Sequence, residues 1–268
     1  YDYIPGQYVA LRATIDGQDV RRSYSICAEP QPGEIRIAIK RDLGGIFSTY
    51  ANESLRRGDV VQVMSPQGAF ISRHAMTGLN HPDELQAELA RTAATSFVAF
   101  AAGSGITPVI AIAKTALAAS PSTRFDLVYV NKAAMDVMFL EELADLKDRW
   151  GARLQVVHVL SREEQGSELL SGRLDRERLQ RLLGSLVPVD SVDEWYLCGP
   201  FGMVTEGREV LLEAGADPSC VHVELFHAEA PPPRVRTAGP VGDAATVTVV
   251  LHGRSSTLAV ERDGDLDH

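Results

Sequence analysis

An arginine and a tyrosine two positions apart stand in the short β-prone segment Arg22-Ser23-Tyr24-Ser25. Because alternate side chains of a strand share a face, Arg22 and Tyr24 are presented together. A guanidinium binds a pyrophosphate through two parallel hydrogen bonds, and a phenol ring can pack against the isoalloxazine ring of a flavin. The segment therefore predicts one side of a flavin dinucleotide site. A barrel strand with a half-buried tyrosine and a surface arginine is the alternative.

Two glycine-rich segments have the composition of phosphate-binding turns. Gly44-Gly45-Ile46-Phe47-Ser48 follows a β-prone run and can begin a helix whose free N–H groups and serine hydroxyl receive phosphate oxygens. Gly103-Ser104-Gly105-Ile106-Thr107-Pro108 follows the apolar run Phe97–Ala101, and Pro108 suits the first turn of a helix. Its glycines let the backbone approach a pyrophosphate, although the third glycine of the usual dinucleotide fingerprint is lacking. A plain turn at each place is the alternative.

Polar residues follow two later apolar runs, Asn131-Lys132 after the first and Ser161-Arg162 after the second. Ligands of open α/β sheets bind at such strand ends. Lys132, Arg162 and Arg173 are candidates to meet a 2′-phosphate, which favours NADP over NAD. Ordinary solvated cations are the alternative.

Two further motifs end apolar runs at the same predicted edge. Cys198-Gly199-Pro200 is expected to shape the pocket beside a nicotinamide, because no His or Asp stands near enough in sequence to activate the thiol. In Glu224-Leu225-Phe226, Phe226 is expected to shield one face of the flavin, and Glu224 to position the nicotinamide or a proton. A structural cysteine and an ordinary core phenylalanine are the alternatives.

The elements that must position these motifs fall into two classes. Up to about Phe70, β-prone runs separated by Gly, Pro and Asp favour an antiparallel β-barrel: Gln7–Arg12, Arg22–Ile26, Ile35–Lys40 and Val60–Met64. From Ser96 onwards, continuous apolar runs alternate with helical patterns, which predicts a doubly wound parallel sheet. We expect a barrel domain over residues 1–92 and an α/β domain over 93–228, with a short helix over His81–Arg91 in the connection between them.

The C-terminal residues differ from both domains. A proline-rich linker is expected over 229–244, and Ala245–Val260 predicts a β-hairpin that turns at His252-Gly253-Arg254. One hairpin is too small to be stable alone, so residues 245–268 are expected to open a further domain that continues beyond this sequence.

Composition excludes several classes of protein. The net charge of −10, without a block of Lys or Arg, argues against a nucleic-acid partner. No apolar run approaches the ~18 residues that span a bilayer, so no membrane association is expected. The three cysteines Cys27, Cys198 and Cys220 lack metal-site spacing, and no secretory signal pattern is present, so a cytoplasmic location is expected.

Taken in order, these motifs resemble the ferredoxin–NADP⁺ reductase superfamily from Pro5 to Phe226. Within it, the segments RRSYSIC, KRDLGGIFS, HVLSRE and SGRLD most resemble the reductase components of phenylacetyl-CoA epoxidase and related multicomponent oxygenases. The resemblance implies earlier barrel strands before Tyr1, the alternative being a barrel with an unprotected edge. It also implies a C-terminal plant-type [2Fe–2S] domain, of which Ala245–Val260 is similar to the first hairpin. The cluster-binding cysteines of such a domain are absent from this sequence, so none of its cysteines is assigned to a metal.

The resemblance also implies a mechanism and roles. NADPH gives hydride to FAD, and the electrons pass singly to a [2Fe–2S] centre in the full-length chain and then to an oxygenase or a ferredoxin-type acceptor. Ser25 is expected to hydrogen-bond near flavin N5, between Tyr24 and Phe226, with Cys198 and Glu224 completing the catalytic set. Binding of the rest of FAD is assigned to Arg22, Ala38, Ile39, Lys40, Gly45, Ile46, Phe47 and Ser48, with Tyr8 as a weaker candidate near it. The resemblance assigns binding of the nicotinamide nucleotide to Gly103, Gly105, Thr107, Pro108, Asn131, Lys132, Ser161, Arg162, Arg173, Cys198, Gly199, Pro200 and Phe226.

Two alternatives to the oxygenase reductase stay open on the sequence. One is a free-standing ferredoxin or flavin reductase. The other is a nucleotide-binding regulatory subunit that kept the fold without turnover, since a fold does not guarantee activity.

Overall fold

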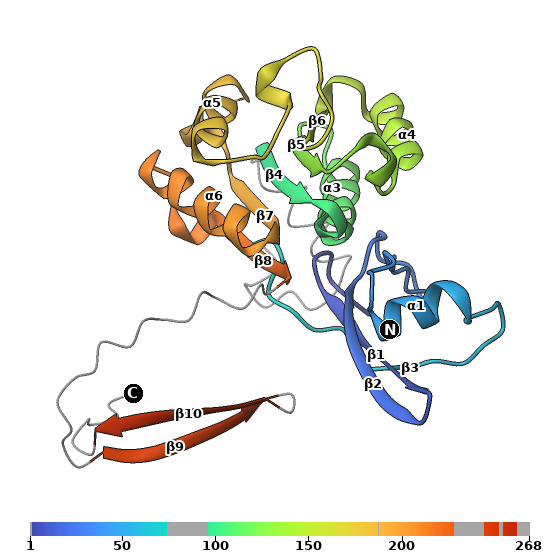
Figure 1. The fold of residues 1–268 in the computed structure, drawn as a ribbon. Coiled ribbons are helices and arrows are strands. Elements are labelled where there is room, and N and C mark those ends of the chain that lie inside the picture. Colours follow the sequence, from blue (N-terminus) through green and yellow to red (C-terminus); the bar gives the residue numbers. More distant parts are fainter. Residues whose placement is uncertain (1, 74–95, 187, 228–243, 252–253, 262–268) are drawn as a thin grey trace. The chain divides into compact units, whose positions relative to one another are not determined.

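The structure is a computed structural model that describes residues 2–73, 96–186, 188–227, 244–251 and 254–261 (Figure 1). It divides into two units, Tyr1–Glu229 and Ala230–His268. The expected helix over His81–Arg91, the domain boundary at 92/93, nearly all of the linker and the hairpin turn at 252–253 lie outside the described residues.

Strands dominate the first part of the chain, and strands alternate with helices after it. The strands are β1 (Tyr8–Ile15), β2 (Gln18–Ser25), β3 (Gln62–Val63), β4 (Ser96–Ala102), β5 (Arg124–Asn131), β6 (Leu154–Leu160), β7 (Glu194–Pro200), β8 (Val221–His227), β9 (Ala244–Leu251) and β10 (Arg254–Glu261). The α-helices of the described residues are α1 (Ile46–Glu53), α3 (Ile106–Ala119), α4 (Leu140–Trp150), α5 (Arg176–Leu186) and α6 (Phe201–Glu213).

The predicted antiparallel sheet is present, and in the described residues it has the strand order β2-β1-β3. β1 and β2 pair from Tyr8 opposite Ser25 to Ile15 opposite Gln18. The two residues that join them, Asp16 and Gly17, both have positive φ, which matches the twist of a tight hairpin. Apolar side chains of this sheet pack around Phe47 of α1, which places that helix beside β2.

The run Ile35–Lys40 differs from the strand that was expected. Ile37 alone forms a bridge, to Ile26, and the Ile39 carbonyl accepts a hydrogen bond from the Asn52 side chain of α1. The Asn52 side chain therefore makes the hydrogen bond to the Ile39 carbonyl that a neighbouring strand would otherwise make.

The predicted doubly wound sheet is confirmed, with five parallel strands in the order β6-β5-β4-β7-β8. α3 and α4 cover one face and α5 and α6 the other, as Figure 1 shows. Strand order reverses between β4 and β7, and ligands of open α/β sheets bind beside such a switch point. α3 begins at Ile106 after a 3₁₀ turn over Gly103–Gly105, two residues before the expected start at Pro108.

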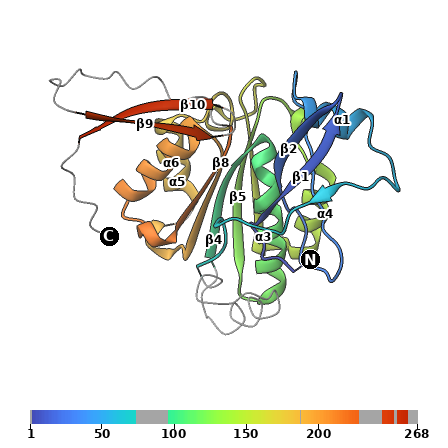
Figure 2. The ribbon, with the colours of Figure 1, turned by 90° about the horizontal axis from the view of Figure 1, so that it is seen from below.

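The antiparallel sheet lies on the α3 side of the parallel sheet (Figure 2). One hydrophobic cluster joins them, with Ile4, Cys27 and Phe70 packed among residues of α3 and β7. The Phe70 and Tyr196 rings meet edge to face at 5.4 Å between centroids. Gly6 is required at this contact, because its φ is +98° and a Cβ there would lie 1.8 Å from the Phe70 carbonyl oxygen.

The second unit contains the antiparallel pair β9–β10, from Ala244 opposite Glu261 to Leu251 opposite Arg254. The hairpin predicted over Ala245–Val260 is therefore present. Within the described part of the chain, no helix combines the length and apolarity that a membrane crossing requires.

Candidate functional site

The end of β2 presents the first predicted group of cofactor ligands. Arg22 is exposed, Tyr24 is half-buried, and Ser25 is buried at 3% exposure. The Tyr24 ring lies 5.7 Å from the Phe47 ring between centroids, so β2 and α1 share an aromatic wall. Tyr8 pairs with Ser25 across the sheet, which keeps this weaker candidate close to the same strand end.

The turn before α1 uses its serine differently from the expectation. The Ser48 hydroxyl accepts a hydrogen bond from the Asp42 N–H at 3.1 Å and donates to the Gly45 carbonyl at 3.2 Å. The hydroxyl therefore holds the turn together. The N–H groups in the first turn of α1 have no partners within the helix, and they remain the candidates for phosphate binding.

The turn before α3 packs directly on the β7 motif. A Cβ on Gly105 would lie 2.3 Å from the Cys198 carbonyl oxygen, so only glycine fits there. Gly103 has a φ of +53° and open space beside it, and its carbonyl accepts a hydrogen bond from the Tyr129 hydroxyl at 2.9 Å. The Thr107 hydroxyl donates to the Ser104 carbonyl at 2.9 Å. This turn thus forms a fixed, open cradle at the N-terminus of a 14-residue helix.

Three predicted catalytic residues meet where the two sheets adjoin. Cys198 and Glu224 are register partners on β7 and β8, with the Cys198 thiol 3.9 Å from the Glu224 carboxylate. Ser25 approaches the same carboxylate from the antiparallel sheet closely enough for its side chain to lower the pKa of Glu224. Residues far apart in sequence therefore form one polar cluster.

Burial controls the protonation of this cluster. It raises the pKa of Glu224 to about 7, against a partial opposing effect of the hydrogen bonds with Ser25 and Cys198. Burial also raises the pKa of the Cys198 thiol well above its ordinary value, and the nearby Glu224 charge adds to that rise. Glu224 can consequently hold or release a proton near neutrality, whereas Cys198 stays a thiol and is not an activated nucleophile.

Phe226 lies two residues beyond Glu224 on the edge strand β8. It is half-buried and packs against the hydrophobic cluster that joins the sheets, as does Ala38 of the predicted flavin-binding segment. The structure thus brings both predicted flavin neighbours to the same cluster.

The predicted cations come from neighbouring segments. The Ser161 N–H donates to the Asn131 carbonyl and the Arg162 N–H to the Lys132 carbonyl, each at 2.8 Å, so the ends of β5 and β6 run side by side. The segment before Arg173 joins them through the Gly172 N–H, which donates to the Leu160 carbonyl at 2.9 Å. Lys132, Arg162 and Arg173 are all exposed.

Asn131 stands out among the polar residues at this edge. Its side chain is 5% exposed and lies near the Tyr129 hydroxyl, but neither amide atom makes a hydrogen bond of ordinary geometry. A buried amide without such a bond is costly. Its position beside the glycine turn fits a ligand that carries its own polar groups.

Some residues between the two sheets have contacts that the sequence did not predict, or contacts that differ from the predicted role. Lys40, expected at FAD, directs its ammonium to the Asp136 carbonyl at 3.2 Å. Arg36, in the segment after β2, forms an ion pair with Glu142 of α4 that the motifs gave no reason to expect. Lys114 is a charged residue within the apolar run of α3. This interruption was the feature of the sequence that could have indicated its contact with Glu142.

Comparison with known proteins assigns both parts of the first unit to known domain families. Residues 1–71 match the family model of the oxidoreductase FAD-binding domain, and residues 100–209 match that of the oxidoreductase NAD-binding domain. The chain is 39% identical over 266 residues to one of the subunits of the 1,2-phenylacetyl-CoA epoxidase of Escherichia coli, covering 99% of this chain and 70% of that protein. This chain belongs to the ferredoxin reductase family.

Further similarities place the chain within the ferredoxin reductase family. It is 29% identical over 271 residues to the ferredoxin reductase component of a 3-ketosteroid-9-alpha-monooxygenase from Mycolicibacterium smegmatis, covering 98% of this chain and 68% of that protein. The solved FAD/NAD-binding domain of a nitric oxide dioxygenase from Vibrio cholerae superposes with a TM-score of 0.66 at 28% identity, covering 84% of this chain and 86% of that one. As a member of this family, the chain is an NAD(P)H-dependent flavin oxidoreductase.

Proposed function

We propose that this reductase takes electrons from NADPH through FAD and delivers them to a [2Fe–2S] centre of the full-length protein, which supplies a multicomponent oxygenase of phenylacetyl-CoA or other aromatic degradation. The observation that carries the proposal is the polar cluster of Ser25, Cys198 and Glu224, which unites the ends of β2, β7 and β8. Bound FAD accepts hydride and releases electrons one at a time.

The residues at the end of β2 suit FAD. Arg22 is exposed and available to pair with a pyrophosphate, and the first turn of α1 offers N–H groups to the same charge. Tyr24 supplies an aromatic face beside Phe47. Ser25 is held between this wall and Glu224, where its hydroxyl can hydrogen-bond a ring nitrogen.

The parallel sheet suits the nicotinamide nucleotide. The glycine turn at 103–105 exposes the N-terminus of α3 to a pyrophosphate. Asn131 brings its buried amide to the same edge, and Lys132, Arg162 and Arg173 offer cations to a 2′-phosphate. Together they bind and orient the substrate and favour NADPH over NADH.

Positioning and water exclusion are the main contributions of the chain to hydride transfer. Cys198 presents a neutral buried thiol, and Glu224 holds a proton at its carboxylate with a pKa of about 7. Ser25 links that carboxylate to the antiparallel sheet. A regulatory subunit that merely binds nucleotides has no need of a half-buried carboxyl whose pKa lies near neutrality.

The similarity to a component of the phenylacetyl-CoA epoxidase supports an oxygenase as the final acceptor, and the β9–β10 hairpin supports a C-terminal [2Fe–2S] domain in the full-length protein. A cytoplasmic location is proposed with it, because such oxygenases draw on NADPH.

The test is anaerobic reduction of the FAD-loaded chain by NADPH, followed by flavin absorbance and then by addition of a soluble one-electron acceptor such as ferricyanide. We expect NADPH to bleach the flavin and the acceptor to restore its colour. A chain that binds FAD and keeps its colour under excess NADPH would contradict the proposal.

A further inference from the structure

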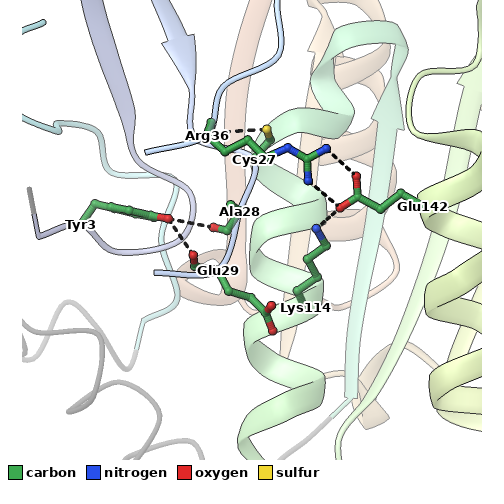
Figure 3. Close-up of polar contacts among 7 residues, drawn as sticks. All are labelled: Tyr3, Cys27, Ala28, Glu29, Arg36, Lys114 and Glu142. Atoms are coloured by element: carbon green, nitrogen blue, oxygen red, sulfur yellow. Dashed lines mark hydrogen bonds and ion pairs between the residues drawn. The ribbon is translucent and has the colours of Figure 1, made fainter. Parts of the chain in front are cut away.

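An ion-pair network joins Arg36, in the segment that follows the antiparallel hairpin, to two helices that cover the parallel sheet (Figure 3). The two terminal nitrogens of Arg36 donate to the two carboxylate oxygens of Glu142 on α4, both at 3.1 Å. Lys114 of α3 donates to the same carboxylate from the other side. A single carboxylate thus connects three segments that are distant in sequence.

The two cations of this network differ in their surroundings. The Lys114 side chain is 10% exposed and that of Arg36 is 51% exposed. Burial raises the pKa of Glu142, but the hydrogen bonds and charges of Lys114 and Arg36 outweigh burial, so the net pKa lies below the ordinary value. Glu142 therefore stays ionised, and it would keep Lys114 as a partner if Arg36 were removed.

The backbone around Arg36 is fixed to the flavin side. The Arg36 carbonyl accepts hydrogen bonds from the Cys27 N–H at 2.9 Å and the Cys27 thiol at 3.3 Å. Cys27 follows Ser25 by two residues, and Arg36 precedes the predicted flavin-binding residues Ala38 to Lys40. A change in the position of Arg36 would therefore shift the neighbouring backbone segments that are expected to hold FAD.

The opposite end of the contact leads to the nucleotide side. Arg36 lies over the Phe139 ring at 5.8 Å, and the neighbouring Met138 N–H donates to the Tyr129 hydroxyl at 3.2 Å. Tyr129 in turn donates to the carbonyl of Gly103, in the turn that opens α3. Contacts therefore run without interruption from Arg36 to the predicted pyrophosphate cradle.

A separate anchor between the sheets lies at the start of β7. The Ser72 hydroxyl donates to the buried Glu194 carboxylate at 2.6 Å, and the Phe70 and Tyr196 rings are in contact close by. The Arg36–Glu142 pair lies at another place in the same interface, which the cluster around Ile4, Cys27 and Phe70 also holds together, and it adds a directional restraint that apolar packing lacks.

We propose that Arg36 is a positioning residue for hydride transfer, which fixes the angle between the flavin-binding and nicotinamide-binding segments through its paired contact with Glu142. This inference rests on the proposed function. A half-exposed ion pair adds little to stability, so its value lies in geometry. Misplacement of reacting groups by about 1 Å can slow a reaction by about a hundredfold.

The decisive variant is Arg36→Met, because methionine keeps an apolar stem over Phe139 and leaves Glu142 paired with Lys114. Arg36→Lys keeps the charge but loses the paired geometry. Arg176→Met is the matched control, since Arg176 also bridges two helices by pairing with Glu209 and Glu213 but lies wholly within the α/β part.

Stopped-flow reduction of the FAD-loaded chain by saturating NADPH separates positioning from binding. We expect Arg36→Met to slow flavin reduction by about tenfold or more, with the Kd for NADPH within about twofold of wild type and full FAD retention. Arg36→Lys should recover part of the rate, and Arg176→Met should match wild type.

Several outcomes would overturn the inference. They are an Arg36→Met rate equal to wild type, an equal loss in Arg176→Met, or a variant that releases FAD or unfolds, which would assign Arg36 to binding or stability instead. Failure of the proposed function is distinguishable from all of these, because the wild-type flavin would then not be reduced by NADPH.

Discussion

The Cys198 thiol lies 3.9 Å from the Glu224 carboxylate, and the two residues are register partners on neighbouring parallel strands. Cys198 is fully buried. The pair lies near the ends of its strands, close to Ser25 of the antiparallel sheet.

Glu224→Gln should change how stability depends on pH. Burial raises the pKa of Glu224 from 4.5 to about 7, so folding takes up a proton between those values and the free energy of unfolding falls as the pH rises through them. Glutamine has no charge to bury, so the variant should gain about 1–3 kcal/mol over wild type above pH 7, after allowance for solvent screening, and less near pH 5.

Chemical denaturation of both proteins at about pH 5 and about pH 8 measures this difference. Glu213→Gln, at an exposed helix residue, is the control. A stability difference between Glu224→Gln and wild type that is the same at both pH values would contradict the assigned protonation.

Gly105→Ala should damage nucleotide binding, because the added Cβ would lie 2.3 Å from the Cys198 carbonyl oxygen and must displace the turn or β7. We expect NADPH affinity to fall at least about tenfold while FAD is retained. The matched control is Gly184→Ala in α5, where nothing lies within 4 Å and alanine should be neutral or add up to about 1 kcal/mol of stability. Titration with NADPH and thermal unfolding of both variants give the comparison.

Arg22→Ala should loosen FAD retention sharply, because it removes the predicted charge-assisted contact with the pyrophosphate. Arg21→Ala is the control on the opposite face of β2, where the side chain pairs with Asp19 at 3.6 Å. Flavin content after gel filtration is the measurement. Full occupancy in Arg22→Ala would reject the role assigned to that arginine.

Arg162→Ala should weaken NADPH binding by about tenfold and leave NADH binding nearly unchanged, because the 2′-phosphate is the only group that distinguishes the two. Arg181→Ala, an exposed arginine on α5, serves as the control. The ratio of kcat/KM for the two nucleotides reports the effect. Equal losses for both would show that Arg162 does not meet that phosphate.

Local patterns were sufficient for much of the architecture. The alternation of apolar runs and helical segments after Ser96 predicts the parallel sheet because each strand is buried on both faces. The helix over Ile46–Glu53 follows the predicted glycine turn. The local pattern predicts a strand over Ile35–Lys40, but this run pairs through Ile37 only, since strand pairing depends on a distant partner that the local sequence does not specify.

The sequence by itself determined the family motifs, their order and the two kinds of sheet, because those follow from short-range periodicity and turn chemistry. Only the tertiary structure decided that Ser25 and Cys198 share the Glu224 carboxylate, that Ser48 closes its own turn, and that Arg36 reaches Glu142. Such contacts join side chains across many residues of sequence. Their distances depend on how the two sheets pack through Ile4, Phe70 and α3, which is a property of the whole core.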